Sequence, residues 1–200
     1  MAEIRVQFIH GLEGSPQGAK ARLLAQHFDC LTPAMDTSDF EACVALQAEV
    51  IRSFEPDLLV GSSFGGAVAV ELLRRGVWRG RTLLLAQAAL KRNPRARLPE
   101  DVTVWIVHGT RDHLVDPADS RRLACTGSAG RVRLFEVEDD HSLHESVVDG
   151  RLVQIKTAVV TGQRIIEGRS LGIGEGLKTA VSESIVAGEH VGLGPVVVAR

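Results

Sequence analysis

Hydrophobic and polar positions follow two different periods over the first 160 residues of the chain. Short runs rich in Val, Leu and Ile, each closed by Gly, Asp or Pro, have the pattern of strands that are buried on both faces. Longer stretches between them carry apolar residues three and four positions apart, as amphipathic helices do. The predicted strands span residues 4–9, 31–33, 57–60, 82–86, 102–107 and 132–137. The predicted helices span residues 15–28, 39–54, 65–75, 117–125 and 144–160.

Strands that alternate with helices predict an α/β fold, in which helices cover both faces of a mainly parallel sheet. We therefore expect a doubly wound, mainly parallel sheet of about six strands. The connection between residues 82–86 and 102–107 is short and contains Pro94 and Pro99. A segment of this length has no room for a separate cap domain.

The composition changes toward the C-terminal end of the chain. All eight aromatic residues (six Phe and two Trp) lie at or before Phe135. Residues 165–174 and 185–194 form a weak internal repeat, but two copies are too few for a solenoid. Ordering a glycine-rich segment costs conformational entropy, which no large aromatic side chain offsets here by burial. We therefore expect a main domain over residues 1–161 and a loosely attached, glycine-rich tail over residues 162–200.

Charge and cysteine content exclude several classes of protein. The 23 basic and 25 acidic residues give a net charge of −2, and the basic residues are scattered, so nucleic acid is not an expected partner. No run approaches the roughly 18 apolar residues of a membrane helix, and the first residues lack the features of a signal peptide. Cys30, Cys43 and Cys125 are widely spaced, which argues against a disulfide framework and a zinc site. We expect a cytoplasmic protein with reduced thiols and no membrane attachment.

One segment carries a strong chemical signal. Residues 57–67 run from a buried strand through Gly61-x-Ser63-x-Gly65 into a helix. A serine on such a tight turn adopts unfavourable backbone dihedrals, and side chains two positions away would collide with the neighbouring strand and helix. This context favours Ser63 as a nucleophile over Ser62, which occupies the variable position of the motif. The alternative interpretation is an ordinary strand-to-helix turn.

A serine nucleophile requires a base, and the base requires a carboxylate that orients it. Both residue types follow later strands: Asp112 lies in the turn after residues 102–107, and His141 follows residues 132–137. Two alternatives lie close to them in sequence. Asp116 directly precedes Pro117 and fits the role of a helix cap better, and His144 falls one helical turn beyond His141.

A metal site is another interpretation of this region. The pair His141-x-x-His144 lies beside Asp139 and Asp140, and both residue types bind metals. No third spaced ligand cluster supports it, so we favour His141 as a base.

The first predicted strand ends in His10-Gly11, within a glycine-rich segment. An acyl-transfer site needs backbone N–H groups there and after the nucleophile, where they stabilise the developing oxyanion. Leu12 and Phe64 are the implied donors. An ordinary glycine-rich turn is the alternative for this segment.

Residues 8–16, 61–66, 108–117 and 139–143 together resemble the α/β-hydrolase superfamily, in particular its small, cap-less, bacterial esterase-like members. The resemblance covers residues 3–160. It implies Ser63 as nucleophile, His141 as base and Asp112 as the residue that orients the base, in the chain order of that superfamily. The sequence begins at the strand before His10, so we expect a sheet that lacks the two leading antiparallel strands.

These observations predict a serine hydrolase that cleaves a carboxylic ester or thioester, with a small acyl group or at the accessible end of a larger substrate, through an acyl-enzyme. No metal or organic cofactor is implied. Without a cap, the site should be shallow and open. Two alternatives from other classes are a lyase or cofactor-free haloperoxidase on the same fold and a hydrolase-like binding protein without turnover.

Overall fold

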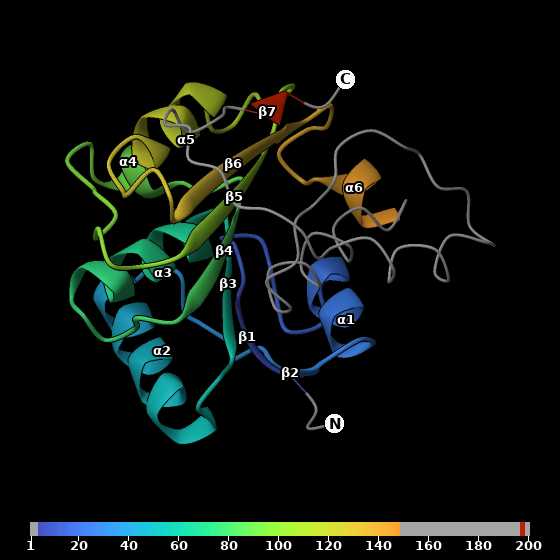
Figure 1. Ribbon diagram of the computed structural model, residues 1–200. Helices are drawn as coiled ribbons and strands as arrows, with labels where there is room; N and C mark the ends of the chain where they lie inside the picture. Colours follow the sequence, from blue (N-terminus) through green and yellow to red (C-terminus); the bar gives the residue numbers. More distant parts are fainter. Residues whose placement is uncertain (1–3, 149–196, 199–200) are drawn as a thin grey trace, which may run out of the picture.

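A parallel sheet forms the centre of the protein in the computed structural model, which describes residues 4–148 and 197–198 (Figure 1). Within these residues the sheet has the strand order β2-β1-β3-β4-β5-β6-β7, and every neighbouring pair is parallel. The strands are β1 (Arg5–Ile9), β2 (Asp29–Leu31), β3 (Leu58–Ser62), β4 (Arg81–Leu85), β5 (Val104–Gly109), β6 (Val132–Val137) and β7 (Val197–Val198). The predicted fold class, an α/β protein with a mainly parallel sheet, is confirmed.

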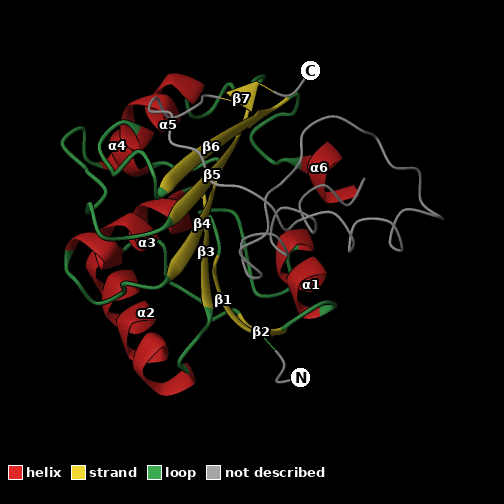
Figure 2. Cartoon of the chain, viewed as in Figure 1, coloured by secondary structure: helices red, strands yellow, loops and turns green. Residues whose placement is uncertain are grey.

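Helices cover both faces of the sheet, as Figure 2 shows. The helices are α1 (Ala19–Ala25), α2 (Phe40–Phe54), α3 (Phe64–Arg74), α4 (Ala89–Arg92), α5 (Pro117–Ala124) and α6 (His144–Val148). Helices α2 to α5 pack on one face, and α1 and α6 pack on the other. None of the described helices is long and apolar enough to cross a membrane.

Each face of the sheet has its own apolar core, because successive side chains of a strand point to opposite faces. In β3, Leu59 packs among the residues of α2 and α3, whereas Leu58 and Val60 pack with the residues of α1. All three are fully buried. Burial on both faces explains why the strands read as continuous apolar runs rather than as alternating patterns.

The strand order reverses between β1 and β3, which are neighbouring strands of the sheet. The chain passes from β1 outward to β2 and then returns to β3, from which it proceeds in the opposite direction across the sheet. Ligands of open α/β sheets bind where the order reverses, outside the carboxyl ends of the strands. Ser63 directly follows β3 at this place.

Several elements differ from their predicted bounds by one to four residues, and contacts in the structure explain two of these differences. Strand β2 occupies residues 29–31 instead of 31–33, because it pairs with β1 through Arg5 and Asp29 at one end and Gln7 and Leu31 at the other. The first helix begins at Ala19 instead of residue 15, since residues 15–18 form a turn closed by the Gly18 N–H and the Ser15 carbonyl oxygen.

Helix α4 was not predicted, because its four residues are too few to show a period. Strand β7 adds two residues from the predicted tail to the β6 edge of the sheet. It lies in the apolar run 195–199, for which pairing as a short edge strand is one interpretation of the sequence. The rest of that tail, and the part of the predicted last helix beyond Val148, lie outside the described residues.

Candidate active site

Ser63 lies on the turn between β3 and α3 in a strained backbone conformation. Its φ is 54° and its ψ is −116°, a region that residues with a side chain rarely adopt. Backbone hydrogen bonds to the next strand retain it there: the Ser63 N–H donates to the Leu85 carbonyl oxygen at 2.9 Å, and the Ser63 carbonyl oxygen accepts from Ala88 at 3.1 Å. The unfavourable dihedrals expected for this serine are present.

The two glycines of the motif allow the turn to pack closely. A Cβ atom on Gly65 would collide with the backbone carbonyl oxygen atoms of Ile9 and His10 at the end of β1. A Cβ atom on Gly61 would lie 2.6 Å from the Gly65 carbonyl oxygen. Glycine is therefore required at both positions, because a side chain there would prevent the close approach of strand and helix. The sequence pattern indicated the same reason.

The structure brings together three residues from three separate loops. The Oγ atom of Ser63, after β3, lies 2.9 Å from Nε2 of His141, after β6. The Nδ1 atom of His141 lies 2.6 Å from Oδ2 of Asp112, after β5. Ser63 is half-buried, and the His141 side chain retains 20% of its exposure, so solvent reaches the two atoms that would react.

Asp112 is the buried member of the three. Its Oδ1 atom accepts the N–H groups of Leu114 at 2.8 Å and Val115 at 2.9 Å. Burial alone would raise the pKa of Asp112, but the hydrogen bonds from Val115, His141 and Leu114 outweigh burial and lower the pKa. The carboxylate is therefore ionised at neutral pH and accepts hydrogen bonds at both oxygen atoms.

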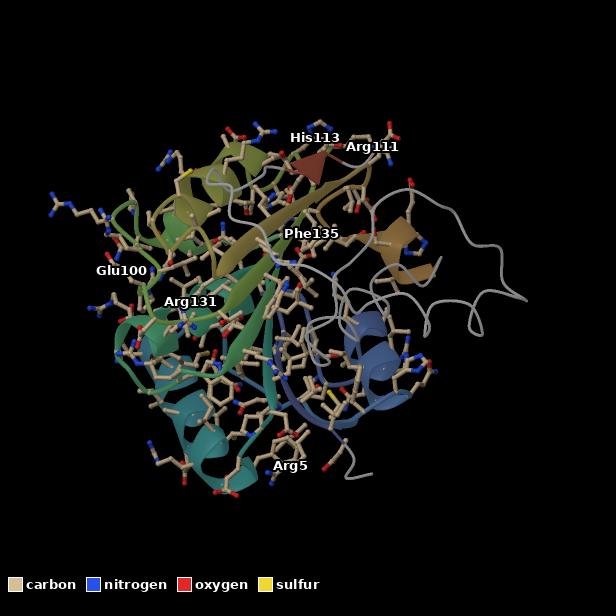
Figure 3. The ribbon with its side chains drawn as sticks, in the orientation of Figure 1. Arg5, Glu100, Arg111, His113, Arg131 and Phe135 are labelled. Carbon is tan, nitrogen blue, oxygen red and sulfur yellow. The ribbon has the colours of Figure 1, made fainter. Side chains whose placement is uncertain are left out.

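The residues on either side of Asp112 in the chain have different surroundings. Arg111 and His113 are exposed at the carboxyl ends of the strands (Figure 3). Only the side chain between them is directed inward, toward His141. Of these three consecutive residues, Asp112 is the one that is buried and hydrogen-bonded to the loop of His141.

The alternative residues occupy other places. The Asp116 side chain caps α5 by accepting the Ala118 N–H at 2.9 Å. His144 is exposed and begins α6. Ser62 is the last residue of β3 and is buried.

The loop that carries His141 is shaped by two carboxylates. Asp139 accepts the Ser146 N–H at 2.8 Å, and Asp140 accepts the Ser142 N–H at 2.8 Å. Within residues 4–148 and 197–198, no group of three or more His, Cys, Asp or Glu side chains has the arrangement of a metal site. Both aspartates thus have a structural part in this loop.

Of the two residues implied as oxyanion donors, Phe64 directly follows Ser63, and Leu12 belongs to the loop after β1. Phe64 is the first residue of α3, so its N–H has no partner within the helix. The loop after β1 comes close on the other side, since a Cβ atom on Gly11 would lie 3.3 Å from the Cβ atom of Ser63. In the described part of the chain, the N–H groups of Phe64 and of Leu12, which follows Gly11, donate to no other residue.

Sequence reasoning missed His108, the fifth residue of β5. Its Nε2 atom lies 3.0 Å from Oδ2 of Asp112, and its Nδ1 atom lies 2.7 Å from Oγ of Ser120. The side chain is fully buried. A histidine inside an otherwise apolar strand, four residues before Asp112, was the signal that could have identified it.

Comparison with known proteins gives the fold. No protein-family model matches the chain, and no curated protein sequence matches it. Solved structures do: the mouse α/β-hydrolase domain-containing protein 10 superposes with a TM-score of 0.64 at 13% identity, over 80% of this chain and 90% of that one. The chain has the α/β-hydrolase fold.

Two further neighbours have the same α/β-hydrolase fold. One belongs to the metagenome-derived lipolytic enzymes LipS and LipT, with a TM-score of 0.63, 17% identity, and coverage of 81% of this chain and 95% of that one. The enol-lactonase of Burkholderia xenovorans LB400 has a TM-score of 0.62, 13% identity, and coverage of 80% and 92%. The connection from β4 to β5, where this chain contains only α4, leaves the carboxyl ends of the strands without an inserted cap.

Proposed function

We propose that the protein is a serine hydrolase that cleaves carboxylic esters or thioesters through an acyl-enzyme intermediate. The observation that carries the proposal is the hydrogen-bonded series from Ser63 Oγ through His141 to Asp112, with separations of 2.9 Å and 2.6 Å. A hydroxyl, an imidazole and a buried carboxylate in this order form the arrangement that activates a serine.

The hydrogen bonds of His141 determine which ring nitrogen takes the proton. Because the Asp112 carboxylate is ionised and only accepts, Nδ1 of His141 carries the hydrogen in their 2.6 Å contact. Nε2 is then the bare nitrogen, and it accepts the hydrogen of the Ser63 hydroxyl. The resting state is therefore ready for proton transfer from serine to histidine.

The proposed reaction has two halves. Ser63 Oγ attacks the substrate carbonyl carbon as its proton passes to Nε2 of His141, and the oxyanion that forms is stabilised by the N–H groups of Leu12 and Phe64. The tetrahedral intermediate collapses, His141 returns the proton to the departing alcohol or thiol, and the acyl group stays on Ser63. Water then attacks the acyl-enzyme as its proton passes to His141, and His141 returns that proton to Ser63 Oγ as the Oγ–acyl bond breaks and the acid leaves.

Exposed apolar side chains favour a substrate with an apolar acyl group. Leu12, Leu31 and Leu114 are the large hydrophobic residues that are exposed in the described part of the chain. All three lie at the carboxyl ends of strands, after β1, at the end of β2 and after β5 respectively. Leucines exposed at the end of the sheet that bears Ser63 suit a substrate with an apolar acyl group.

The names of two neighbours agree with this proposal, since one group is lipolytic and another neighbour is an enol-lactonase. The geometry also favours a hydrolase over a binding protein. A protein that only binds has no need for a serine in a strained conformation, a base and a buried carboxylate in hydrogen-bonded order.

Hydrolysis of p-nitrophenyl acetate and p-nitrophenyl butyrate tests the proposal. We expect the wild-type protein to hydrolyse both, and Ser63→Ala to lose at least about a thousandfold in kcat, since nucleophile and base act as a unit. The matched control is Ser62→Ala, which removes a neighbouring hydroxyl and should stay within a few-fold of wild type. Equal losses in both variants, or full activity in Ser63→Ala, would contradict the proposal.

A further inference from the structure

A series of buried polar side chains extends behind Asp112, on the side away from His141. It consists of Gln87 after β4, Ser120 in α5 and His108 in β5, and all three are fully buried. Buried polar groups are costly unless they are hydrogen-bonded, so their hydrogen bonds are expected to be directional and complete.

The orientation of the Gln87 amide determines which atom donates and which accepts in each of these hydrogen bonds. The Gln87 Oε1 atom accepts the Ala89 N–H at 2.7 Å, so the amide nitrogen is the end that faces Ser120, at 3.0 Å. An amide nitrogen only donates. The Ser120 oxygen therefore accepts from Gln87, and its own hydrogen is available for Nδ1 of His108 at 2.7 Å.

This arrangement determines the tautomer of His108. Burial lowers the pKa of His108 and outweighs the opposing effects of the Val115 carbonyl and Asp112, so the ring is neutral and carries one hydrogen. Since Nδ1 accepts from Ser120, that hydrogen is on Nε2. Both groups near Nε2, the Val115 carbonyl oxygen at 3.0 Å and Asp112 Oδ2 at 3.0 Å, can only accept. The Nε2–H group of His108 is thus hydrogen-bonded to the Val115 carbonyl oxygen and lies at the same distance from Asp112 Oδ2, the carboxylate oxygen that also contacts His141.

We propose that His108 is a positioning residue: its Nε2–H group holds the Asp112 carboxylate in place for His141 and limits how strongly that carboxylate attracts the His141 proton. The catalytic part of this inference rests on the proposed function. Gln87 and Ser120 act through His108, because they keep its hydrogen on the nitrogen that faces Asp112.

The charged groups of the surrounding elements have partners of their own, and Lys20 of α1 interacts electrostatically with Asp140 and Asp139. The pairs are Lys91 of α4 with the Leu114 carbonyl oxygen, Arg121 of α5 with Glu136 of β6, and Arg111 with Glu145 of α6. Asp139 and Asp140 accept backbone N–H groups of their own loop. Within the part of the chain that the structure describes, the two histidines are therefore the titratable groups in contact with the Asp112 carboxylate.

Two measurements on the full-length protein test the role of His108. One is the pH dependence of kcat/KM for p-nitrophenyl butyrate, and the other is an NMR titration of the His141 ring. The variants are His108→Phe, which removes the donor, and Ser120→Ala, which removes the group that fixes the tautomer. The matched control is His113→Phe, because His113 adjoins Asp112 in the chain but is exposed.

With one hydrogen bond fewer, the Asp112 carboxylate attracts the protonated His141 ring more strongly. In His108→Phe we expect kcat to fall about tenfold, with KM within about twofold of wild type. The acid limb of the kcat/KM profile and the NMR titration of the His141 ring should both move to higher pH, by about half a unit or more. Ser120→Ala should move both in the same direction by less, and His113→Phe should move neither.

Unchanged midpoints in folded His108→Phe would overturn the proposal, even with lower thermal stability, because a residue that only supports packing does not change the titration of His141. If circular dichroism shows His108→Phe unfolded, Ser120→Ala decides by the same criterion. The ring titration does not depend on turnover. A wild-type protein that hydrolyses no ester would contradict the proposed function, while the titration would still decide the role of His108.

Discussion

Ser63 shows how a single residue depends on its neighbours. A non-glycine residue in a sparsely populated backbone region costs roughly 1–3 kcal/mol and persists only where surrounding contacts hold it. Here the contacts come from β4 through the backbone of Leu85 and Ala88, and from β1 through the close approach of Gly65 to Ile9. The position of the hydroxyl is thus a property of three neighbouring strands.

Replacing Gly65 with Ala should disturb both stability and activity. The added Cβ atom meets the backbone carbonyls of Ile9 and His10, which cannot rotate away as a side chain can. We expect the free energy of unfolding to fall by about 2 kcal/mol or more, as for an overpacked core, and ester hydrolysis to fall as the loop after β1 shifts. Urea unfolding and p-nitrophenyl butyrate hydrolysis measure the two effects.

Gly130→Ala is the matched control for this substitution, since a Cβ atom at Gly130 meets nothing within 4 Å. Its free energy of unfolding should stay within about 0.5 kcal/mol of wild type. Equal stability of the Gly65→Ala and Gly130→Ala variants would show that the end of β1 is not packed against the turn as described.

Residues of the candidate site differed in how far the sequence could reveal them. Ser63, Asp112 and His141 each follow a predicted strand, and parallel strands bring such positions to one edge of a sheet. His108 lies inside a strand, and its hydrogen-bond partner Ser120 belongs to a helix that the sequence predicts only as a surface-covering element. Its role depends on a contact between elements, and the pattern of one segment does not contain that information.

At the scale of elements, α2 and α3 are linked by charged side chains as well as by their apolar faces. Glu71 of α3 pairs with Arg74 at 2.6 Å and with Arg75 at 2.6 Å, and Arg75 also pairs with Glu41 of α2 at 2.7 Å. The hydrogen bond from Arg74 is the largest effect on Glu71; it and Arg75 outweigh burial and lower the pKa of Glu71 to about 2.

This shift predicts how stability depends on pH. A carboxyl whose pKa is depressed in the folded state stabilises the protein above its ordinary pKa, here 4.5, and this contribution is lost as the pH falls toward about 2. We therefore expect Glu71→Gln to be less stable than wild type at pH 7, with the difference shrinking between about pH 4.5 and pH 2. Chemical unfolding at a series of pH values measures the difference.

The control is Glu100→Gln, which removes an exposed carboxylate from the connection between β4 and β5 (Figure 3). Its stability should follow wild type at every pH. A difference between wild type and Glu71→Gln that stays constant from pH 7 to pH 2 would mean that the ion pairs of Glu71 do not stabilise the folded state.

Elements with a strong local pattern were predicted close to their observed bounds. Asp39 caps α2 by accepting the Ala42 N–H at 3.0 Å, and Pro117 begins α5, as their sequences indicated. Strand β2 has three residues and was placed two positions too late, because its register is set by pairing with β1. Strand β7 pairs with β6 across a large separation in sequence, which no local pattern reports.

At the scale of the whole molecule, the order of the strands determines where chemistry can occur. The strand order reverses between β1 and β3, and the loops after β1, β3, β5 and β6 meet at the carboxyl ends of the strands. The α/β alternation in the sequence predicted the layers. The positions of β2 and β7 at the two edges of the sheet could be assigned only from the structure.

The division of the chain at residue 161 remains a prediction that deletion can test. Removing residues 162–200 takes away β7, which contributes two paired residues at the edge of the sheet, and leaves β1 to β6 intact. We expect the shortened protein to fold and to hydrolyse p-nitrophenyl acetate at a rate comparable to that of the full chain. Circular dichroism and the ester assay measure this, and an unfolded product would mean that all 200 residues form one unit.

The central claim is that Ser63 is an activated nucleophile, and covalent labelling tests it most directly. The full-length protein is treated with a fluorophosphonate probe, digested, and mapped by mass spectrometry, with Ser63→Ala and Ser62→Ala treated in parallel. We predict a single adduct on Ser63 in the wild-type protein and in Ser62→Ala, and no adduct in Ser63→Ala, because the probe reacts with a serine whose proton His141 can accept. An adduct on Ser62, or a folded wild-type protein that takes up no probe, would contradict the account.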